Sequence, residues 1–503
     1  MLSIEVPIVL TGLYVGKRTE NNLDETQNGT FARDKEGDNV KTEVAALGLV
    51  VLLAGAIVAA CAALPTVSLN DAKATANQMA LARDAHGNLP APGTEILLKR
   101  RWSTSTLDAS ALAILEEAAT GAPLIAGNKV QLLFDGPLTM AEMEKSIANA
   151  KNSINFETYI FDQDEQGKRF ADLLMRKQRE GVVVNVIYDS VGTINVPQPF
   201  FERMRSGGIH LVAFNPVNPA KLRGNGWKLN NRDHRKLLIV DGKVAFTGGV
   251  NISDTYANSS PFRARRDKRE NDNNDSGWRD THLKVEGPAV SAMQWAFVQS
   301  WLEQDADDLR AADYFPVQFA MGDMVLRVLA TKPQGRFEIY RSLLLTVQEA
   351  KKSIHMTCAY FVPDKQTLSA LTSAAGRGVE VELVLPSISD AGIVHQASRA
   401  YYTPLLEAGV RIHELKHSVL HAKSVVVDGV WSTVGSTNID KRSFVHNYEL
   451  NVIVIGDAFG AEMDSAFQED LRNSTEVTLS AWQRRPLLAR LGEWLAGLLD
   501  YWL

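Results

Sequence analysis

The chain has 503 residues, more than one ordinary hydrophobic core holds, so at least two domains are expected. With 45% hydrophobic and 22% charged residues and a net charge of −6, its composition is globular. That balance argues against a surface coated with positive charge for nucleic acid, although a local basic groove stays open. Two cysteines, Cys61 and Cys358, argue against a disulfide framework.

The N-terminal part combines a polar stretch with an apolar one. Residues 1–43 show no sustained period, and we expect them to be disordered. Residues 44–64 are uncharged and reach the ~20 residues that a membrane-spanning helix needs. Within this run, VAAC resembles the lipobox of a bacterial lipoprotein signal, which would make Cys61 a lipidated residue. Two interpretations stay open: a signal whose true start lies near Val40, or a plain membrane anchor.

The rest of the chain divides into a leader and a repeat. Residues 65–124 carry helical character, most plainly around 107–121, and we expect a helical leader without visible chemistry. An internal repeat then predicts a first domain at 125–315 and a second at 316–476.

Matching segments show the repeat. AKNSINFETYIF at 150 pairs with AKKSIHMTCAYF at 350, and REGVVVNVIYDS at 179 pairs with GRGVEVELVLPS at 376. The valine-rich runs are almost continuously apolar, as buried parallel strands are, and the helices predicted between them end at glycines. We therefore predict an α/β fold with two duplicated α/β/α domains packed about a pseudo-twofold axis.

The C-terminal residues 477–503 have a different pattern. Leucines and tryptophans recur at helical spacing, with arginines between them. This indicates an amphipathic helix at a membrane interface, with a helix docked on the protein's own core as the alternative.

A short motif occurs once in each half at identical spacing. DHRKLLIVDGKVAFTGGVN starts at 233, and LHAKSVVVDGVWSTVGSTN starts at 420. Each holds two strand-like runs joined by Asp-Gly, a hairpin signal, so Asp241 and Asp428 are predicted to be turn residues. In an extended segment, residues two apart point to the same face, which pairs His234 with Lys236 and His421 with Lys423.

Two faces that each carry a histidine and a lysine suit phosphodiester exchange. If the halves converge, one histidine can attack phosphorus while the other protonates the leaving oxygen. The lysines would offset charge on the non-bridging oxygens. At the hairpin ends, small and polar residues are candidates for binding the phosphate: Gly249, Asn251, Ser436 and Asn438.

Each histidine also needs a partner on its other ring nitrogen. Asp280 and Glu449 occupy corresponding strand-like positions downstream of the two motifs. We predict that Asp280 orients His234 and that Glu449 orients His421, each within its own half. Surface strand acids are the alternative.

The doubled HxKxxxxD motif, His234/Lys236/Asp241 and His421/Lys423/Asp428, resembles that of the phospholipase D superfamily. Over residues 125–475, segments such as WRDTHLKVEGPAV and NIDKRSFVHNYELNV are most similar to bacterial cardiolipin synthases. The resemblance implies that the six motif residues form the catalytic set, with His234 as nucleophile and His421 as general acid. It also implies a monomer that needs no metal and no other cofactor.

The resemblance further implies an activity and a location. Two phosphatidylglycerols would give cardiolipin and glycerol through a phosphohistidine, with phosphatidylethanolamine as a further candidate substrate. The enzyme would sit at the bacterial cell membrane and have no nucleic-acid partner. The chain departs from the family in a charged segment at 257–277, expected to be a solvated loop, and in its single apolar N-terminal segment.

Other features of the sequence allow different interpretations. HELKH at 413–417 matches a zinc-protease string, but it alternates like a strand, so its histidines would not share a helical face. A phospholipase D hydrolase stays open, because no residue string decides between water and a lipid alcohol as acceptor. A nuclease would need a basic groove with stacking aromatics. A non-catalytic binding protein would be expected to have lost one of the motifs.

Overall fold

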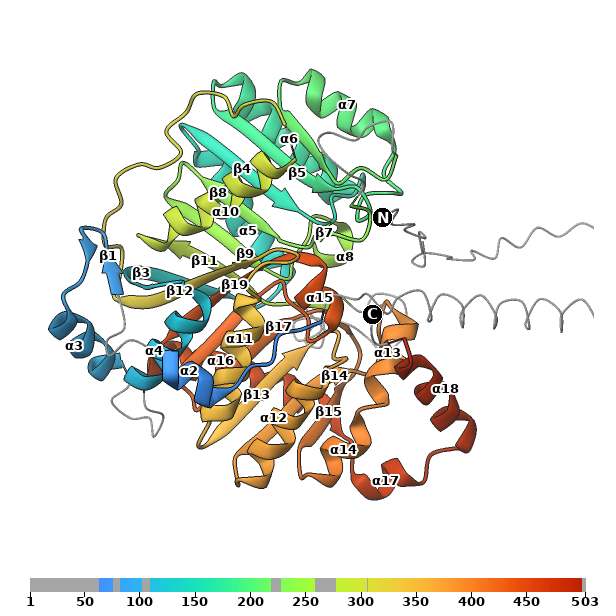
Figure 1. The fold of residues 1–503 in the computed structure, drawn as a ribbon. Coiled ribbons are helices and arrows are strands. Elements are labelled where there is room, and N and C mark those ends of the chain that lie inside the picture. Colours follow the sequence, from blue (N-terminus) through green and yellow to red (C-terminus); the bar gives the residue numbers. More distant parts are fainter. Residues whose placement is uncertain are drawn as a thin grey trace, which may run out of the picture. The chain divides into compact units, whose positions relative to one another are not determined.

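The repeated pattern builds the same series of strands and helices twice in a computed structural model of the chain (Figure 1). The structure describes residues 63–75, 82–101, 109–218, 228–257, 277–304 and 306–499. The predictions for residues 1–43, for nearly all of 44–64 including Cys61, and for most of the loop at 257–277 lie outside this part. The chain divides into compact units at 1–63 and 64–503, and the second unit is described below.

The first half alternates strands and helices and then adds a hairpin. Its elements are β3 (Leu124–Leu133), α5 (Gly136–Asn149), β4 (Ser153–Thr158), α6 (Glu165–Arg179), β5 (Val183–Asp189), α7 (Gln198–Ser206), β6 (His210–Phe214), β7 (Arg232–Asp233), β8 (Leu237–Val240), β9 (Val244–Gly248), α8 (Asp254–Ala257), β10 (Trp278–Arg279), β11 (His282–Glu286) and α10 (Ala289–Glu303).

The second half repeats this order with few changes. Its elements are β12 (Met324–Thr331), α11 (Glu338–Glu349), β13 (Ser353–Cys358), α12 (Lys365–Gly376), β14 (Glu380–Pro386), α13 (Gly392–Arg399), α14 (Tyr402–Glu407), β15 (Arg411–Leu415), β16 (Val419–Leu420), β17 (Lys423–Val427), β18 (Trp431–Gly435), α15 (Lys441–Val445), β19 (Asn447–Ile455) and α16 (Asp457–Arg472). The predicted boundary at 315/316 falls between α10 and β12.

The strands of the two halves join into one sheet. Along the first half the order is β6-β5-β4-β8-β9-β11-β3, and along the second it is β12-β19-β18-β17-β13-β14-β15. The two series meet where β3 pairs antiparallel with β12 (Figure 1). Each strand thereby supplies hydrogen-bond partners for what would otherwise be an open edge of the other half.

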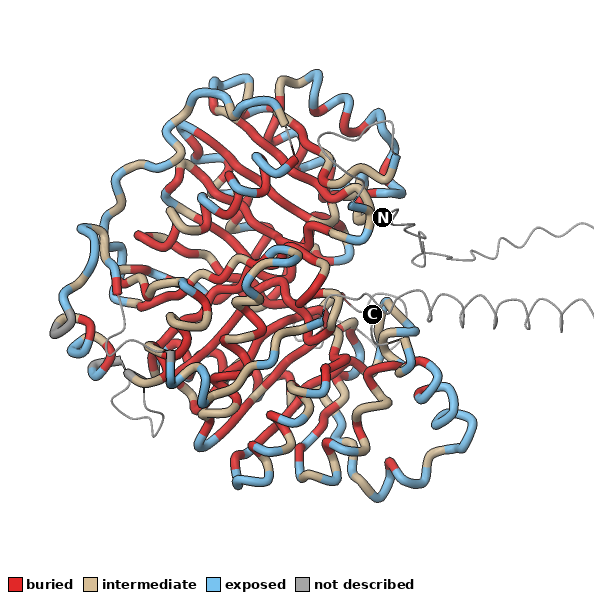
Figure 2. The backbone as a smooth tube through the Cα atoms, viewed as in Figure 1, coloured by how far each residue is buried: buried red, intermediate tan, exposed pale blue. Residues whose placement is uncertain are grey.

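Apolar side chains fill the space on both faces of this sheet. The strands are mostly buried and the outer helix faces exposed (Figure 2). One hydrophobic cluster combines strand residues of both halves, such as Leu237 and Val452, with α10 and α16. Aspartates begin the helices that follow the strands: Asp135 caps α5, Asp164 caps α6 and Asp364 caps α12.

The leader is not purely helical. Besides α2 (Leu69–Thr75), α3 (Ala91–Arg101) and α4 (Ala109–Thr120), it holds a short hairpin of β1 (Ala82–Asp84) and β2 (Gly87–Asn88), and β1 pairs with β3. Helix α4 also places Glu116 inside the second half. This carboxylate accepts hydrogen bonds from Ser342 and from Nε1 of Trp431 and lies 3.5 Å from Nε of Arg327. The leader is therefore part of the core.

The C-terminal segment consists of β20 (Ser474–Glu476), α17 (Leu479–Gln483) and α18 (Leu487–Gly497). Pro486 separates the two helices, so the predicted single helix is broken. Among the described residues, no helix has both the length and the hydropathy required to cross a bilayer.

Candidate active site

Hairpins position the two motifs. His234 and His421 lie just before β8 and β17, the first strands of the hairpins β8–β9 and β17–β18. They keep exposed fractions of 8% and 5%, whereas Asp280 and Glu449 are completely buried. The histidines therefore keep a small contact with solvent, whereas the acids have none.

The motif aspartates lie at the far ends of the hairpins. Asp241 and Asp428 have φ of 54° and 53°, as the tight turns require. The Asp241 carboxylate accepts hydrogen bonds of 2.7–3.1 Å from the backbone amides of residues 151–153, and Asp428 does the same for residues 351–353. Both side chains stabilise the turn against the start of a neighbouring strand. This agrees with the prediction from the Asp-Gly turn, and it gives both aspartates a structural role at the end of the hairpin opposite the histidines.

The acids pair with the histidines of the opposite half. Nδ1 of His234 lies 3.1 Å from Oε1 of Glu449, and Nδ1 of His421 lies 2.7 Å from Oδ2 of Asp280. The prediction that each acid serves its own half is therefore wrong. Because an ionised carboxylate only accepts hydrogen bonds, Nδ1 of each ring carries the proton and Nε2 is left free for chemistry.

Two short strand pairings explain why each histidine contacts the acid of the opposite half. The start of β19 runs parallel to β7, so the His234 amide donates to the Tyr448 carbonyl at 3.0 Å. Likewise β10 runs parallel to β16, and the His421 amide donates to the Arg279 carbonyl at 2.8 Å. Each histidine is thus fixed beside the residue that precedes its acid.

The lysines turn back to their own histidines. Nζ of Lys236 donates to the His234 carbonyl at 2.7 Å, and Nζ of Lys423 donates to the His421 carbonyl. Burial lowers the pKa of Lys236 to about 7 and also lowers that of Lys423. The positive charge of Lys423 adds to the lowering of the pKa of both Lys236 and His234, in agreement with the contacts between the two halves.

Burial also sets the protonation of the histidines. It lowers the pKa of His234 to about 4, although the Glu449 charge works in the other direction. Burial and the Lys423 charge lower the pKa of His421. Both rings are therefore neutral near pH 7 before substrate binds, and each presents a free Nε2 lone pair.

The predicted phosphate-binding residues have mixed positions. The Asn251 side-chain oxygen accepts a hydrogen bond from the Ile160 amide, and its nitrogen donates to the Tyr256 hydroxyl at 2.8 Å. Both ends of this side chain are therefore used in contacts within the protein. Gly249 lies against Asp280, where an added Cβ would come within 2.0 Å of Oδ1. The corresponding Ser436 donates to Glu449. These two residues support the acids rather than a phosphate.

Asn438 keeps a capacity for hydrogen bonding. It is buried, and its carbonyl oxygen has no hydrogen-bond partner among the residues that the structure describes. Of the four predicted phosphate-binding residues, it is the one whose side chain the structure leaves partly unused.

Aromatic residues that the sequence prediction missed surround the histidines. Tyr159 meets the His234 ring edge-on at 5.1 Å, and Tyr256 and Trp278 approach the His421 ring at 5.4 and 5.2 Å. They remove the rings from water and contribute to the desolvation that lowers their pKa values. Trp278 lies two residues before Asp280 in the sequence. This nearness to a predicted site residue is the one local signal that could have indicated Trp278.

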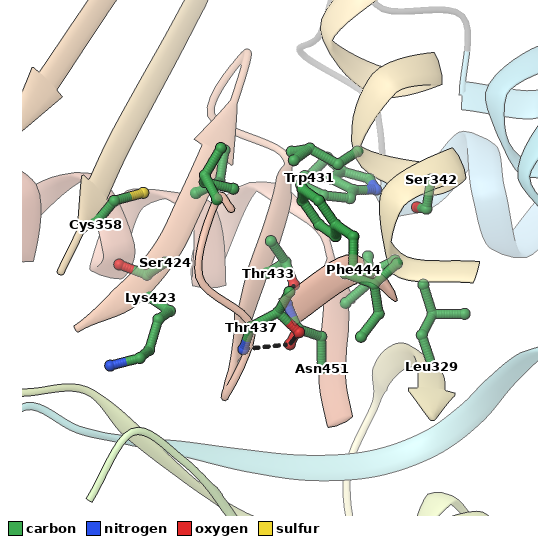
Figure 3. A pocket seen from close by; sticks show the side chains of 15 residues that line it. Leu329, Ser342, Cys358, Lys423, Ser424, Trp431, Thr433, Thr437, Phe444 and Asn451 are labelled. Carbon is green, nitrogen blue, oxygen red and sulfur yellow. Dashed lines mark hydrogen bonds between the residues drawn. The ribbon is translucent and has the colours of Figure 1, made fainter. Parts of the chain in front are cut away.

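A small cavity lies beneath the second motif (Figure 3). It holds about 20 Å³, room for one water molecule, and its lining includes Trp431, Thr433 and Cys358. Burial raises the pKa of Cys358 to about 12. The cavity is far too small for a lipid headgroup and belongs to the core of the second half.

The zinc-protease string is part of a strand. His413 lies in β15, and His417 follows that strand with φ of 63°. The helix that H-E-x-x-H requires is therefore not formed, as the alternating pattern predicts. Among the described residues, no cluster of three or more histidine, cysteine, aspartate or glutamate side chains is arranged to hold a metal ion.

Comparisons with known proteins agree with this geometry. The family model described as "Cardiolipin synthase, PLD-like domain" matches residues 143–260 and 343–471. Cardiolipin synthase 1 of Bacillus cereus is 34% identical over 383 residues, 74% of this chain and 72% of that protein. The major cardiolipin synthase of Bacillus subtilis (strain 168) is 33% identical over 378 residues, covering 74% and 75% of the two chains.

Among solved structures, phosphatidylserine synthase of Haemophilus influenzae superposes with a TM-score of 0.54 at 12% identity, over 74% of this chain and 95% of that one. This likeness shows the fold alone. With the duplicated family match and the extended identity to the curated relatives, the chain belongs to the cardiolipin synthase family within the phospholipase D superfamily.

Proposed function

We propose that this protein is a phosphatidyltransferase that converts two phosphatidylglycerols into cardiolipin and glycerol. The observation that carries the proposal is the pair of buried histidines, each with its Nδ1 on a carboxylate and its Nε2 free. Membership of the cardiolipin synthase family supports the lipid substrate.

The reaction would take two displacements at phosphorus. In the first, Nε2 of one histidine attacks the phosphate of a phosphatidylglycerol. The bond from phosphorus to the glycerol oxygen breaks. The other histidine takes up a proton from solvent when the phosphate anion binds, and it donates this proton to the leaving glycerol. In the second, that histidine takes the proton from the hydroxyl of another phosphatidylglycerol. The resulting oxygen attacks phosphorus, and the phosphorus–nitrogen bond breaks to give cardiolipin.

The contacts of the acids support His234 as nucleophile and His421 as acid. Glu449 shares its charge among His234, Ser436 and the Asn447 side chain, which donates to Oε1 at 3.1 Å. It therefore stabilises a protonated His234 only weakly. Asp280 lies closer to His421. Apart from that ring, its carboxylate accepts a hydrogen bond from the backbone amide of Thr281, so it favours a protonated His421 more strongly than Glu449 favours a protonated His234. An arriving phosphate anion adds to this effect.

The proposal places the reaction at a bacterial membrane. Residues 44–64, or a lipid on Cys61, would attach the chain, and the C-terminal helix would lie at the interface. Phosphatidylethanolamine is a further candidate substrate. One chain carries both motifs, which supports a monomer as the active species.

The test uses purified protein on phosphatidylglycerol vesicles, with and without phosphatidylethanolamine and without added metal. Lipid mass spectrometry should detect cardiolipin, and free glycerol should appear in equal amount. His234→Ala and His421→Ala should each abolish both products. Phosphatidic acid as the sole product would identify water as the acceptor and a phospholipase D. No lipid product from the unmodified protein would overturn the proposal.

A further inference from the structure

Helix α18 is packed with its polar side inward. Glu493 and Ala496 are buried, whereas the leucine and tryptophan side chains face outward. The exposed fractions are 77% for Leu487, 83% for Leu488 and 59% for Trp494, and Leu491, Leu495 and Leu498 are also exposed. A surface helix of a globular domain has the opposite arrangement. In Figure 2 most of α18, at the lower right, is drawn as exposed.

Buried polar contacts fix this orientation. The Glu493 carboxylate accepts from Nε of Arg485 at 2.8 Å and from Nε of Arg399, in α13, at 3.3 Å. The Arg485 guanidinium also lies 3.7 Å from the ring centre of the buried Trp482. The Trp482 indole in turn donates to the Thr403 hydroxyl at 3.0 Å. Helix α18 is thus fastened to α13 and α14 while its apolar side stays uncovered by the described residues.

The segment before α13 and the start of α13 add further exposed apolar residues. Helix α13 packs against α18 and begins two residues after Asp390. The Asp390 carboxylate accepts from the Tyr360 hydroxyl at 2.7 Å, and the amide of the preceding Ala359 donates to the carbonyl of Ala422, the residue after His421, at 2.9 Å. On either side of Asp390, Ile388 and Ile393 are about half exposed, at 51% and 49%. Exposed apolar side chains are therefore also present in the segment that leads into α13.

We propose that the outward face of α13 and α18 inserts into the interface of a phospholipid bilayer and presents the active site to the lipid headgroups. The face carries the leucines and Trp494 of α18 together with Ile388 and Ile393. An apolar face that a helix leaves exposed in this way is typical of a docking site. The exposed Arg484, which precedes α18, and the exposed Arg490, which lies within it, match the negative charge of anionic lipids. The choice of a bilayer rests on the proposed function, because a lipid-modifying site must reach its substrate in the membrane.

Contact with lipid can be read from Trp494 itself. Residues 44–64 would hold any variant on vesicles, so binding alone does not report on α18. Full-length protein is reconstituted in phosphatidylglycerol/phosphatidylethanolamine vesicles whose acyl chains are brominated near the headgroup, and tryptophan quenching is recorded. Trp494→Phe should remove part of the quenching. The matched control is Trp295→Phe, since Trp295 in α10 is similarly exposed at 50% and should contribute none.

Turnover separates docking from catalysis. Leu488→Asp should lower cardiolipin formation on vesicles by about tenfold or more, because a charge enters the apolar face. The same variant should keep its turnover of monomeric short-chain phosphatidylglycerol. Val317→Asp serves as control, since Val317 is 75% exposed in the connection between α10 and β12. It should behave as the unmodified protein on both substrates.

Three results would overturn the docking proposal. One is unchanged quenching in Trp494→Phe, and another is equal loss by Leu488→Asp on vesicles and on monomeric lipid. The third is a dimer, detected by cross-linking, that Leu488→Asp dissociates, which would assign the face to a second copy of the chain. If the unmodified protein turns over neither form of phosphatidylglycerol, the proposed function fails while the quenching result still decides the docking.

Discussion

At the scale of single residues, the two histidines differ through their acids. Glu449 is a longer side chain whose charge is shared with Ser436 and Asn447, whereas Asp280 holds His421 at 2.7 Å. Where the second half has Ser436, the first half has Gly249, pressed against Asp280. This difference supports the proposal that His234 attacks phosphorus and His421 carries the proton.

A leaving group that needs no proton tests this assignment. With phosphatidyl-p-nitrophenol, His421→Ala should still release a burst of nitrophenol close to one equivalent, because His234 can attack and the leaving group departs as an anion. His234→Ala should release none. The burst is followed by stopped-flow absorbance. The assignment is wrong if the two variants exchange behaviours.

The pH dependence of kcat/KM should reflect the lowered pKa values of the site's histidines and of Lys236. Because burial lowers the pKa of His234 to about 4, the neutral nucleophile persists well below 6.5, and kcat/KM should fall on the acid side only near pH 4. Burial lowers the pKa of Lys236 to about 7 and also lowers that of His421, so the lysine charge and the proton of the acid are both lost as pH rises, giving a basic limb. Lys236→Arg should remove only the lysine's part of that limb, since arginine stays charged. An acid limb at 6.5 would contradict the burial argument.

At the scale of elements, the hairpins convert sequence spacing into geometry. The Asp-Gly turns, the strand alternation and the series of helices were predictable because they depend on neighbours in the chain. Which histidine each acid contacts was not predictable in this way. These contacts depend on pairings such as β7 with β19, which are only two residues long and join segments more than 200 residues apart. The orientation of α18 was hidden for a similar reason: the pattern defines an apolar side but not what that side contacts.

Replacing a turn aspartate should weaken the fold without changing the chemistry. Asp241→Ala removes the acceptor for the amides of Lys151, Asn152 and Ser153 and places alanine at a positive φ. The free energy of unfolding should fall by about 2–4 kcal/mol, measured in urea. Asp241→Asn should lose less, since asparagine tolerates this φ and keeps one acceptor oxygen. Unchanged stability with lost turnover would return Asp241 to the catalytic set.

At the scale of the molecule, buried ion pairs join the halves around the site. The Arg279 guanidinium, from β10, binds both carboxylate oxygens of Asp470 in α16 at 2.7 and 2.8 Å. The Arg279 carbonyl accepts from the His421 amide, so this contact between halves leads directly to a catalytic ring. Arg235 similarly reaches the carbonyls of Glu449 and Thr331.

Breaking the Arg279 pair should affect stability and turnover together. Asp470→Ala leaves a buried guanidinium without its carboxylate, which should cost roughly 3–5 kcal/mol of unfolding free energy. Turnover by the remaining folded protein should also fall, since the segment that holds His421 loosens. Asp470→Asn should recover part of both losses. Denaturant titration and cardiolipin formation on the same samples provide the measurements, and a full-activity Asp470→Ala would contradict this coupling.

The exchange of acids between halves has a consequence for how such a site can diversify. Two identical copies of one half could assemble only a site in which both histidines have the same acid and the same supporting residue. In a single chain, the copies are free to differ, and here they do: aspartate beside glycine in one, glutamate beside serine in the other. Covalent linkage of the halves thus allows a division of labour that a symmetric pair of separate subunits is unable to express.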